Sequence, residues 1–205
     1  MRYWSADWHL GHQNIIKYCK RPFKSVGEMN DAILSQCHET LLPDDELWIL
    51  GDVAMGDISE NLELIKSINA HLVLIAGNHD RCFDATRGDH QKWIDKYMEV
   101  GFAEIHIGAV EVEIGKVKAL ACHFPYFGDS RETDRLTQFR PINLGLPLLH
   151  GHVHEKWRAN ANQINVGLDA WNGKLVEEET LTNLLREKVQ DLEIIPWGDL
   201  ETLET

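Results

Sequence analysis

Seven Asp, Asn and His side chains of this 205-residue chain, all of types that bind metal ions, fall in five short clusters at similar positions. The clusters are Asp7 with His9, then Asp52, Asn78, His123, and finally His152 with His154. Imidazole, carboxylate and amide oxygen without thiolate suit Mn, Fe, Zn or Ni better than Ca or Mg. Seven groups exceed one tetrahedral site but suit two ions that share a bridging carboxylate. Asp52 stands alone in its cluster and is the predicted bridge.

Each cluster follows an apolar run typical of a β-strand. The runs are RYWSA before Asp7, LWIL before Asp52, LVLIA before Asn78, KALAC before His123 and LPLLHG before His152. In α/β proteins, ligands collect at the carboxyl ends of strands, so we expect these side chains to converge. Residues two apart in extended backbone point to the same side, which predicts one centre for each Asp-x-His or His-x-His pair. The neighbouring glycines permit tight turns.

The elements that must position these clusters alternate between strands and helices in the first half of the chain. Apolar residues recur every three or four positions over Met29–Leu41, Ile58–Ile68 and Leu181–Val189, which predicts three helices. The middle of the chain is rich in strand patterns, FAEIHIG, VEVEIG and, later, QINVGL. This combination predicts one α/β domain over residues 1–205, built on two sheets. Residues 124–146 have no predicted structure, and loops of that length are often functional.

The charge and composition of the chain disfavour some classes of binding partner. The net charge of −13 and the absence of a Lys/Arg run disfavour long nucleic acids. No apolar run is long enough to cross a bilayer, and the N-terminus lacks a signal-peptide pattern. The four cysteines are scattered, as in reduced proteins. We therefore expect a cytoplasmic protein without a membrane partner; the oligomeric state is not indicated.

Taken in order, the blocks DWH, GD, GNHD, H and GHVH resemble the signature of the calcineurin-like metallophosphoesterase superfamily. The match runs from residue 7 to residue 154, and GNHD and GHVH are its specific parts. The opening DWHLGHQNIIKYCKRPF is further similar to small stand-alone phosphoesterases of bacteria and phages. The resemblance implies a four-layer αββα sandwich, with two mixed sheets flanked by helices and a dinuclear metal site at one edge.

The resemblance also implies a role for each residue. By motif position, one divalent ion is held by Asp7, His9, Asp52 and His154, and a second by Asp52, Asn78, His123 and His152. Mn²⁺ is the first expectation, with Fe, Zn or Ni as alternatives. His79 would protonate the leaving oxygen, and Asp80 would orient His79. From their positions beside these motifs, and not from the resemblance, we expect His12 and Arg81 to contact phosphate.

The expected activity is metal-dependent hydrolysis of an ester bond. A hydroxide shared by the two ions would attack a phosphomonoester or phosphodiester in a small, nucleotide-like substrate. The alternative is a catalytically silent metal-binding scaffold of the same fold. Any one cluster alone is more often a turn or a hydrogen-bonded structural group than a metal site. The presence of His79 together with every metal ligand favours the enzyme.

Overall fold

The computed structural model describes residues 1–198. The first of its two β-sheets has five strands in the order β10-β1-β2-β3-β4. Strands β1 to β4 run parallel, and β10 pairs antiparallel with β1. The strands are β1 (Arg2–Ser5), β2 (Glu46–Ile49), β3 (His71–Ile75), β4 (Phe102–His106) and β10 (Val176–Glu177). Parallel order places the carboxyl ends of β1, β2 and β3 side by side, as convergence of the clusters requires.

The second sheet has the order β11-β8-β9-β7-β6-β5. Strands β6, β7 and β9 run parallel, and the remaining pairs are antiparallel. The strands are β5 (Val110–Ile114), β6 (Val117–Ala121), β7 (Leu148–His150), β8 (Ala159–Asn160), β9 (Gln163–Asn165) and β11 (Asp191–Leu192). His123 follows β6, and His152 and His154 follow β7, so this sheet supplies three of the seven predicted ligands.

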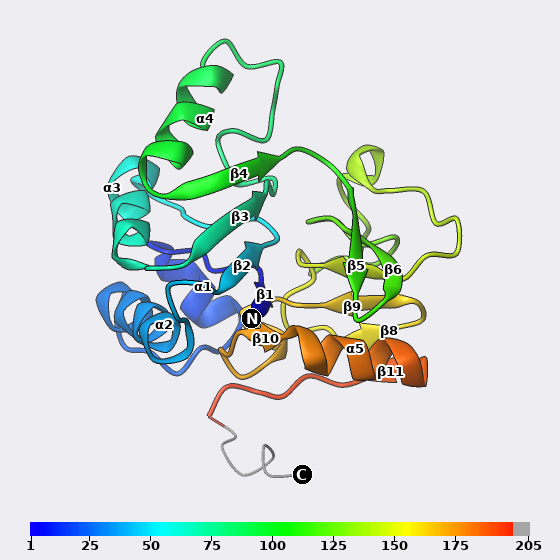
Figure 1. Ribbon diagram of the computed structural model, residues 1–205. Coiled ribbons are helices and arrows are strands. Elements are labelled where there is room, and N and C mark those ends of the chain that lie inside the picture. The colour runs from blue at the N-terminus through cyan, green and yellow to red at the C-terminus, as the bar shows by residue number, and fades with distance from the viewer. Residues whose placement is uncertain (199–205) are drawn as a thin grey trace.

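Helices flank the two sheets (Figure 1). They are α1 (Gln13–Tyr18), α2 (Val26–Thr40), α3 (Ile58–Leu62), α4 (His90–Glu99) and α5 (Glu178–Glu187), with 3₁₀ turns η1 (Glu63–Ser67), η2 (Thr137–Phe139) and η3 (Leu168–Ala170). The apolar stripe of α2 buries Met29, Ile33 and Cys37 against Leu47 and Leu74 of the first sheet. Ser25 caps α2 by accepting the N–H of Glu28. Helix α5 packs against β1, β10, β5 and β6.

A second core lies between the sheets because residues alternate sides along each strand. Trp4 and Trp48 stack with ring centroids 5.1 Å apart, and Val73 extends this face along β3. The opposite sheet contributes Ile114 and Leu149 to the same core. Two mixed sheets flanked by helices confirm the expected fold class.

The elements differ from the sequence prediction in detail. The helix expected over 58–68 is α3 followed by the 3₁₀ turn η1, while α1, α4 and the two-residue strands β8, β10 and β11 were not predicted. Residues 124–146 contain only η2. Within residues 1–198, no helix is long and apolar enough to cross a membrane. The predicted domain of residues 1–205 includes 199–205, which lie outside the described residues.

Candidate metal centre

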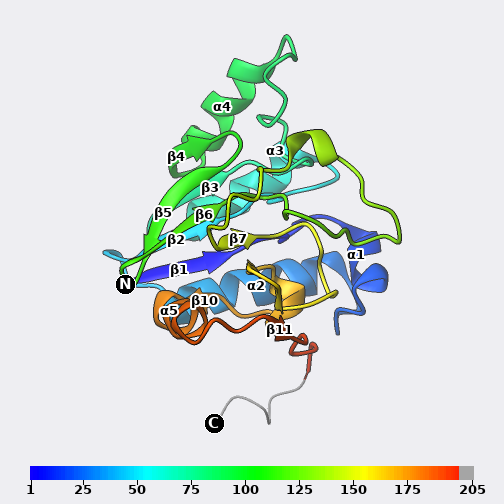
Figure 2. The same cartoon turned by 90° about the vertical axis from the view of Figure 1, so that its right-hand side faces the viewer.

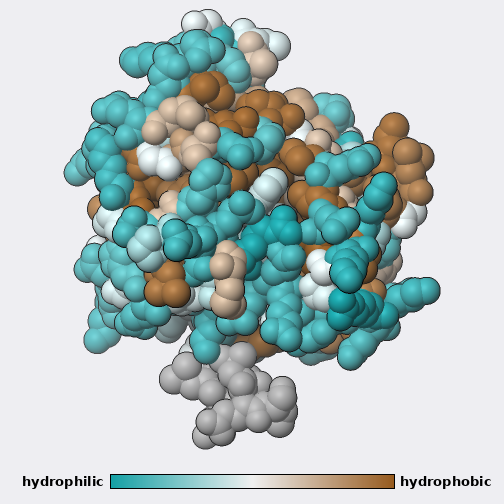
Figure 3. All heavy atoms as spheres, viewed as in Figure 1, coloured by the Kyte–Doolittle hydropathy of each residue, from teal (hydrophilic) through white to brown (hydrophobic). Residues whose placement is uncertain are grey.

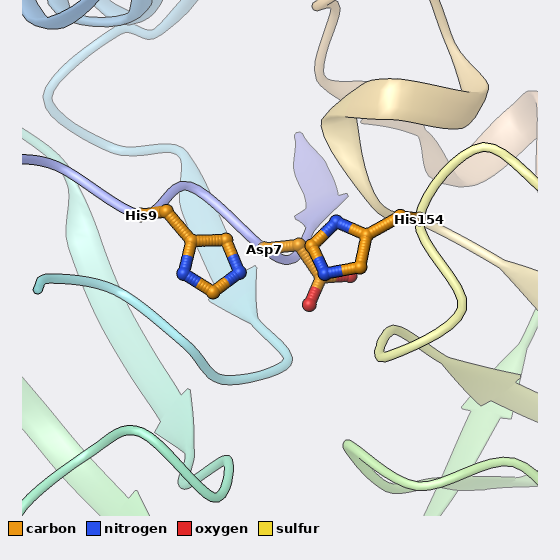
Figure 4. A group of neighbouring side chains, drawn as sticks. All are labelled: Asp7, His9 and His154. Atoms are coloured by element: carbon orange, nitrogen blue, oxygen red, sulfur yellow. The ribbon is translucent and has the colours of Figure 1, made fainter. Parts of the chain in front are cut away.

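The seven predicted ligands meet beyond the carboxyl ends of five strands from both sheets. Ligand atoms of Asp7, His9 and His154 lie within 4.8 Å of one another, and so do those of Asp7, Asp52 and His123. Figure 4 shows the first group, with the Asp7 carboxylate beside the two imidazoles. The remaining two predicted ligands adjoin His123: the amide oxygen of Asn78 is 3.2 Å from its Nε2, and the ring of His152 is 5.2 Å from its ring.

The carboxylate of Asp52 lies at the centre of the arrangement. Its Oδ1 accepts the backbone N–H of His79 at 2.9 Å. Its Oδ2 is 3.6 Å from Nε2 of His123, 3.8 Å from Nε2 of His9 and 4.0 Å from Nε2 of His79. These distances exceed ordinary hydrogen bonds. Two atoms that each lie about 2.1 Å from one ion are about 3–4 Å apart, so the spacing around Oδ2 fits metal ligation.

Three of the four imidazole ligands have one nitrogen occupied by a protein acceptor. Nδ1 of His123 is 2.7 Å from the carbonyl of Leu50, and Nδ1 of His154 is 2.8 Å from Asp169. Nε2 of His152 is 3.2 Å from Asp129. An acceptor on one nitrogen fixes the tautomer and orients the other nitrogen for a metal, which is the usual environment of a ligating histidine.

His9 provides the observation that most directly fits a cation. Its side chain is buried, and neither ring nitrogen has a hydrogen-bond partner among residues 1–198. A buried polar atom without a partner costs about 1–3 kcal/mol. Burial also lowers the pKa of His9 well below its ordinary value, which keeps the imidazole neutral, as a ligand must be. A divalent ion would satisfy this residue.

Neighbouring groups of opposite charge set the protonation states of Asp52 and His154. Burial alone would raise the pKa of Asp52, but the nearby imidazoles of His123 and His9 hold it below its ordinary value. Burial opposes the charge on His154, yet the carboxylates of Asp7 and Asp169 raise its pKa to about 9. Asp52 is therefore a carboxylate over the neutral range, whereas a metal bound at His154 must displace a proton.

The backbone conformation at five of the predicted ligands differs from the extended conformation that the sequence analysis assumed. Asp7, His9, Asp52, His152 and His154 all have positive φ, between 52° and 71°, so the extended geometry assumed for their two-residue spacing is wrong. This conformation costs roughly 1–2 kcal/mol per residue with a side chain. Such strain is typical of sites that the surrounding structure holds in place.

Backbone contacts between the loops hold this geometry. The N–H of Asp7 bonds the carbonyl of Gly51 at 3.0 Å, and the N–H of His9 bonds the carbonyl of Asp52 at 2.9 Å. Gly51 and Gly77 allow a close approach, because a Cβ at Gly77 would lie 2.4 Å from Oδ1 of Asp52. A side chain at Gly77 would therefore displace the central carboxylate.

Arg21 and Asp169 form a buried network that the sequence analysis did not find. The Arg21 guanidinium donates to the carbonyls of Asp7 and Trp8 at 2.7 and 2.8 Å and to Asp169 at 2.8 Å. Asp169 in turn accepts from His154. One ion pair thus supports ligands from both sheets. Neither residue is among the ligands and catalytic groups that the sequence analysis predicted, and no local pattern marks Asp169.

Asp80 does not have its expected partner. Its carboxylate accepts the backbone N–H groups of Asp52 and Gly77 at 2.8 Å, the N–H of Val53 at 3.1 Å and the hydroxyl of Tyr97 at 2.9 Å. Within residues 1–198, no hydrogen bond joins it to the ring of His79. The expectation that Asp80 orients His79 is therefore wrong: Asp80 holds the turn that carries Asp52.

His79 lies between two cavities. Its side chain is 43% exposed, and it lines both a cavity of about 640 Å³ over the ligand cluster and a neighbouring cavity of about 460 Å³. His12 lines the larger cavity, with its ring 5.5 Å from that of His9. Arg81, expected to contact the same phosphate, lines only the smaller one.

The loop of residues 124–146 reaches the larger cavity through an aspartate that the sequence did not single out. Asp129 is buried and accepts from Arg135 at 2.6 Å as well as lying against His152. Arg131 and Arg135 line the cavity. Figure 2 shows this loop and α1 on the same side of the molecule, toward which the arrow of β1 points.

Comparison with known proteins agrees with this geometry. Residues 4–194 match the family model described as calcineurin-like phosphoesterase. The chain is 32% identical to the Gene 66 proteins of Mycobacterium phage L5, over 89% of this chain and 93% of the relative, and of phage D29, over 93% and 96%. A crystal structure of a protein of unknown function from Aquifex aeolicus has a TM-score of 0.65 and 25% identity, covering 90% of this chain and 98% of that one.

Two facing mixed sheets with Asp and His clusters at one edge define a metallophosphoesterase-like protein. The chain belongs to the calcineurin-like phosphoesterase family. It is, at the level of that family, a hydrolase acting on ester bonds.

Proposed function

We propose that this protein hydrolyses a phosphomonoester or phosphodiester bond in a small, nucleotide-like substrate at a dinuclear metal centre. The observation that carries the proposal is the carboxylate of Asp52, with one oxygen 3.6 Å from Nε2 of His123 and 3.8 Å from Nε2 of His9, the imidazoles assigned to the two different ions. No hydrogen bond explains that convergence, and a shared carboxylate between two cations does.

The proposed ligand sets are those that the motif order implies, and the cluster of Asp7, His9 and His154 supports the first of them. Asp7, His9 and His154 would hold one ion together with Asp52, while Asn78, His123 and His152 would hold the second with the same Asp52. Two divalent cations, Mn²⁺ first among the candidates, would supply positive charge for the phosphoryl oxygens and lower the pKa of a water molecule. Asp129, Asp169 and the carbonyl of Leu50 keep the imidazoles oriented.

His79 would donate a proton to the departing oxygen. Its backbone N–H is anchored on Asp52, but its half-exposed ring has no hydrogen-bond partner within residues 1–198, so the ring is free to meet a substrate. His12 and Arg131, on other walls of the larger cavity, would contact the phosphoryl group. A cavity of about 640 Å³ has the size of a small-molecule site, which supports a small substrate.

A phosphoester screen tests the proposal. Purified full-length chain is incubated with 4-nitrophenyl phosphate, bis(4-nitrophenyl) phosphate and a set of nucleotides, with added Mn²⁺ or with chelator. We expect Mn²⁺-dependent hydrolysis of at least one class, lost in chelator, and unaltered by Lys92→Ala, an exposed position on α4 away from the cluster. Full metal occupancy without turnover of any substrate would favour the scaffold instead.

A further inference from the structure

The smaller cavity beside His79 differs in chemistry from the cavity over the ligand cluster. It measures about 460 Å³, and Phe83, Leu136 and Phe139 form its apolar wall. Arg81 and Arg87 line its other part. The larger cavity is instead lined mainly by imidazoles and charged groups. The two cavities share Met55, Asn78 and His79, so one substrate could occupy both.

The apolar wall is held in place by ring packing. Phe83 and Phe139 meet edge to face with centroids 4.9 Å apart, and both pack on the buried ring of Phe124. Phe124 in turn lies 5.3 Å from the ring of His152. Phe139 remains 44% exposed, so an aromatic surface is available next to the cluster. Flat rings pack favourably on such a surface.

Arg81 is the cation available in this cavity. Arg87 already donates to Asp89 at 3.0 and 3.3 Å, and Asp84, the exposed carboxylate of the lining, is engaged by Thr86 at 2.6 and 2.9 Å. Arg81 is exposed and has no hydrogen bond or ion pair with any other residue of 1–198. A free guanidinium beside an aromatic wall suits an anion attached to a ring.

We propose that this cavity binds the leaving group of the substrate, an alcohol that carries an aromatic body and a second negative charge. The proposal rests on the proposed function, in which His79 protonates the leaving oxygen. The oxygen of water bonds to phosphorus, the ester P–O bond breaks, the leaving oxygen takes the proton of His79, and the proton lost by water restores His79. The departing alcohol must then lie on the His79 side, where Arg81 is.

Arg81 therefore has a role different from that expected of a phosphate contact. In the proposed complex, Arg131 contacts the reacting phosphoryl group in the larger cavity. Arg81 binds a negatively charged group on the leaving alcohol instead. The two arginines give a matched comparison. Loss of Arg131 should weaken every substrate, while loss of Arg81 should weaken only substrates with a charged leaving group.

The test uses two isosteric diesters, methyl 4-carboxyphenyl phosphate and methyl 4-carbamoylphenyl phosphate, with the Mn²⁺-loaded full-length chain. Arg81→Ala should lower kcat/KM about tenfold for the carboxyphenyl ester, as for loss of a charge-assisted hydrogen bond, and less than about twofold for the carbamoyl ester. Phe139→Ala should lower both about three- to tenfold. Lys92→Ala is the control and should change neither. Equal losses on both esters with Arg81→Ala would overturn the proposal.

A binding measurement separates this proposal from the proposed function. The dissociation constants of 4-hydroxybenzoate and 4-hydroxybenzamide, the two leaving groups, are measured by calorimetry on the full-length chain with and without chelator. Tighter binding of the benzoate, abolished by Arg81→Ala, supports the cavity even if no ester is hydrolysed. Hydrolysis of the esters without any such preference would overturn the cavity's role and leave the proposed function standing.

Discussion

Two parts of the chain border the same cavity and are built in different ways. The turns after β1 and β2 carry Asp7 and Asp52, which are both buried, and two backbone hydrogen bonds join these turns, from Asp7 to Gly51 and from His9 to Asp52. The loop of residues 124–146 instead exposes Ile142 and Leu144, which are 78% and 86% accessible. Figure 3 shows a group of hydrophobic side chains at the right-hand edge of the molecule, where the ribbon of this loop runs in Figure 1. Only a few groups of the loop reach the ligand cluster.

This difference in construction indicates different roles: the turns set the geometry of the reaction, and the loop sets the choice of substrate. Parallel strands fix the turns in register, so a change there alters the ligand geometry itself. The loop is tied to the cluster through Asp129, which lies against His152, and through the rings around Phe124. Changes in the loop should therefore alter affinity and substrate choice more than the reaction. Variants of the turns and of the loop test this division of roles.

The largest effect is expected from Asp52→Asn in the turn after β2. Loss of the shared charge should release metal and lower kcat/KM at least about 10³-fold, because ligation and transition-state charge are lost together. Elemental analysis and steady-state kinetics measure the two effects, and circular dichroism confirms folding. A folded variant that retains both full metal content and activity would contradict the assignment of Asp52.

His79→Gln should separate chemistry from metal binding. Turnover should fall about 10²–10⁴-fold, the usual contribution of a general acid, while the metal content per chain stays that of the wild type. The deficit should be greatest for esters with poorly leaving alcohols, since these most need the proton. Loss of metal in this variant would show that His79 is a ligand rather than a proton donor.

Asp129→Asn tests the link between the loop and the cluster. A weaker acceptor at His152 should lower the affinity for Mn²⁺ about 10–100-fold, as for carboxylates behind ligating histidines elsewhere. Asp134→Asn is the matched control, because Asp134 is exposed and contacts Arg140 and Gly128 but not a ligand. Titration with Mn²⁺ followed by activity and by calorimetry gives both affinities. Equal behaviour of the two variants would remove Asp129 from the site.

The smallest effect is expected at the tip of the loop. Ile142→Ser and Leu144→Ser should change the free energy of unfolding by no more than about 0.5 kcal/mol and leave kcat/KM unaltered, since both side chains are exposed. Urea unfolding and kinetics provide the check. A loss of several kcal/mol would mean that these side chains are buried in solution, and the contrast with the turns would fail.

The sequence predicted the strands and the convergence of the ligands well, because both depend on local patterns. Apolar runs ending in Asp, Asn or His mark strand ends, and parallel strands bring such ends together. The left-handed backbone of Asp7 and His9 could not be predicted, because contacts with the neighbouring loop impose it. The spacing rule for extended chains grouped Asp7 with His9 correctly but for the wrong geometric reason, and it failed for His152 and His154, which lie in different ligand groups.

The residues that support the ligands could not be predicted from the sequence either, because tertiary contacts define their partners. Asp80 looks like a partner of His79 in sequence, but its four donors come from β-strand ends and α4. Asp169 and Asp129 lie in segments without a motif, and only tertiary contacts bring them to His154 and His152. The identity of the ions, a cytoplasmic location and a single domain over residues 1–205 stay predictions.

The central claim is that one carboxylate, Asp52, lies between two cations. Anomalous diffraction from crystals grown with Mn²⁺ measures this directly. We expect two peaks about 3.5–4 Å apart, one on each side of Asp52, bordered by His9 on one side and His123 on the other. A single peak, or peaks remote from Asp52, would contradict the account.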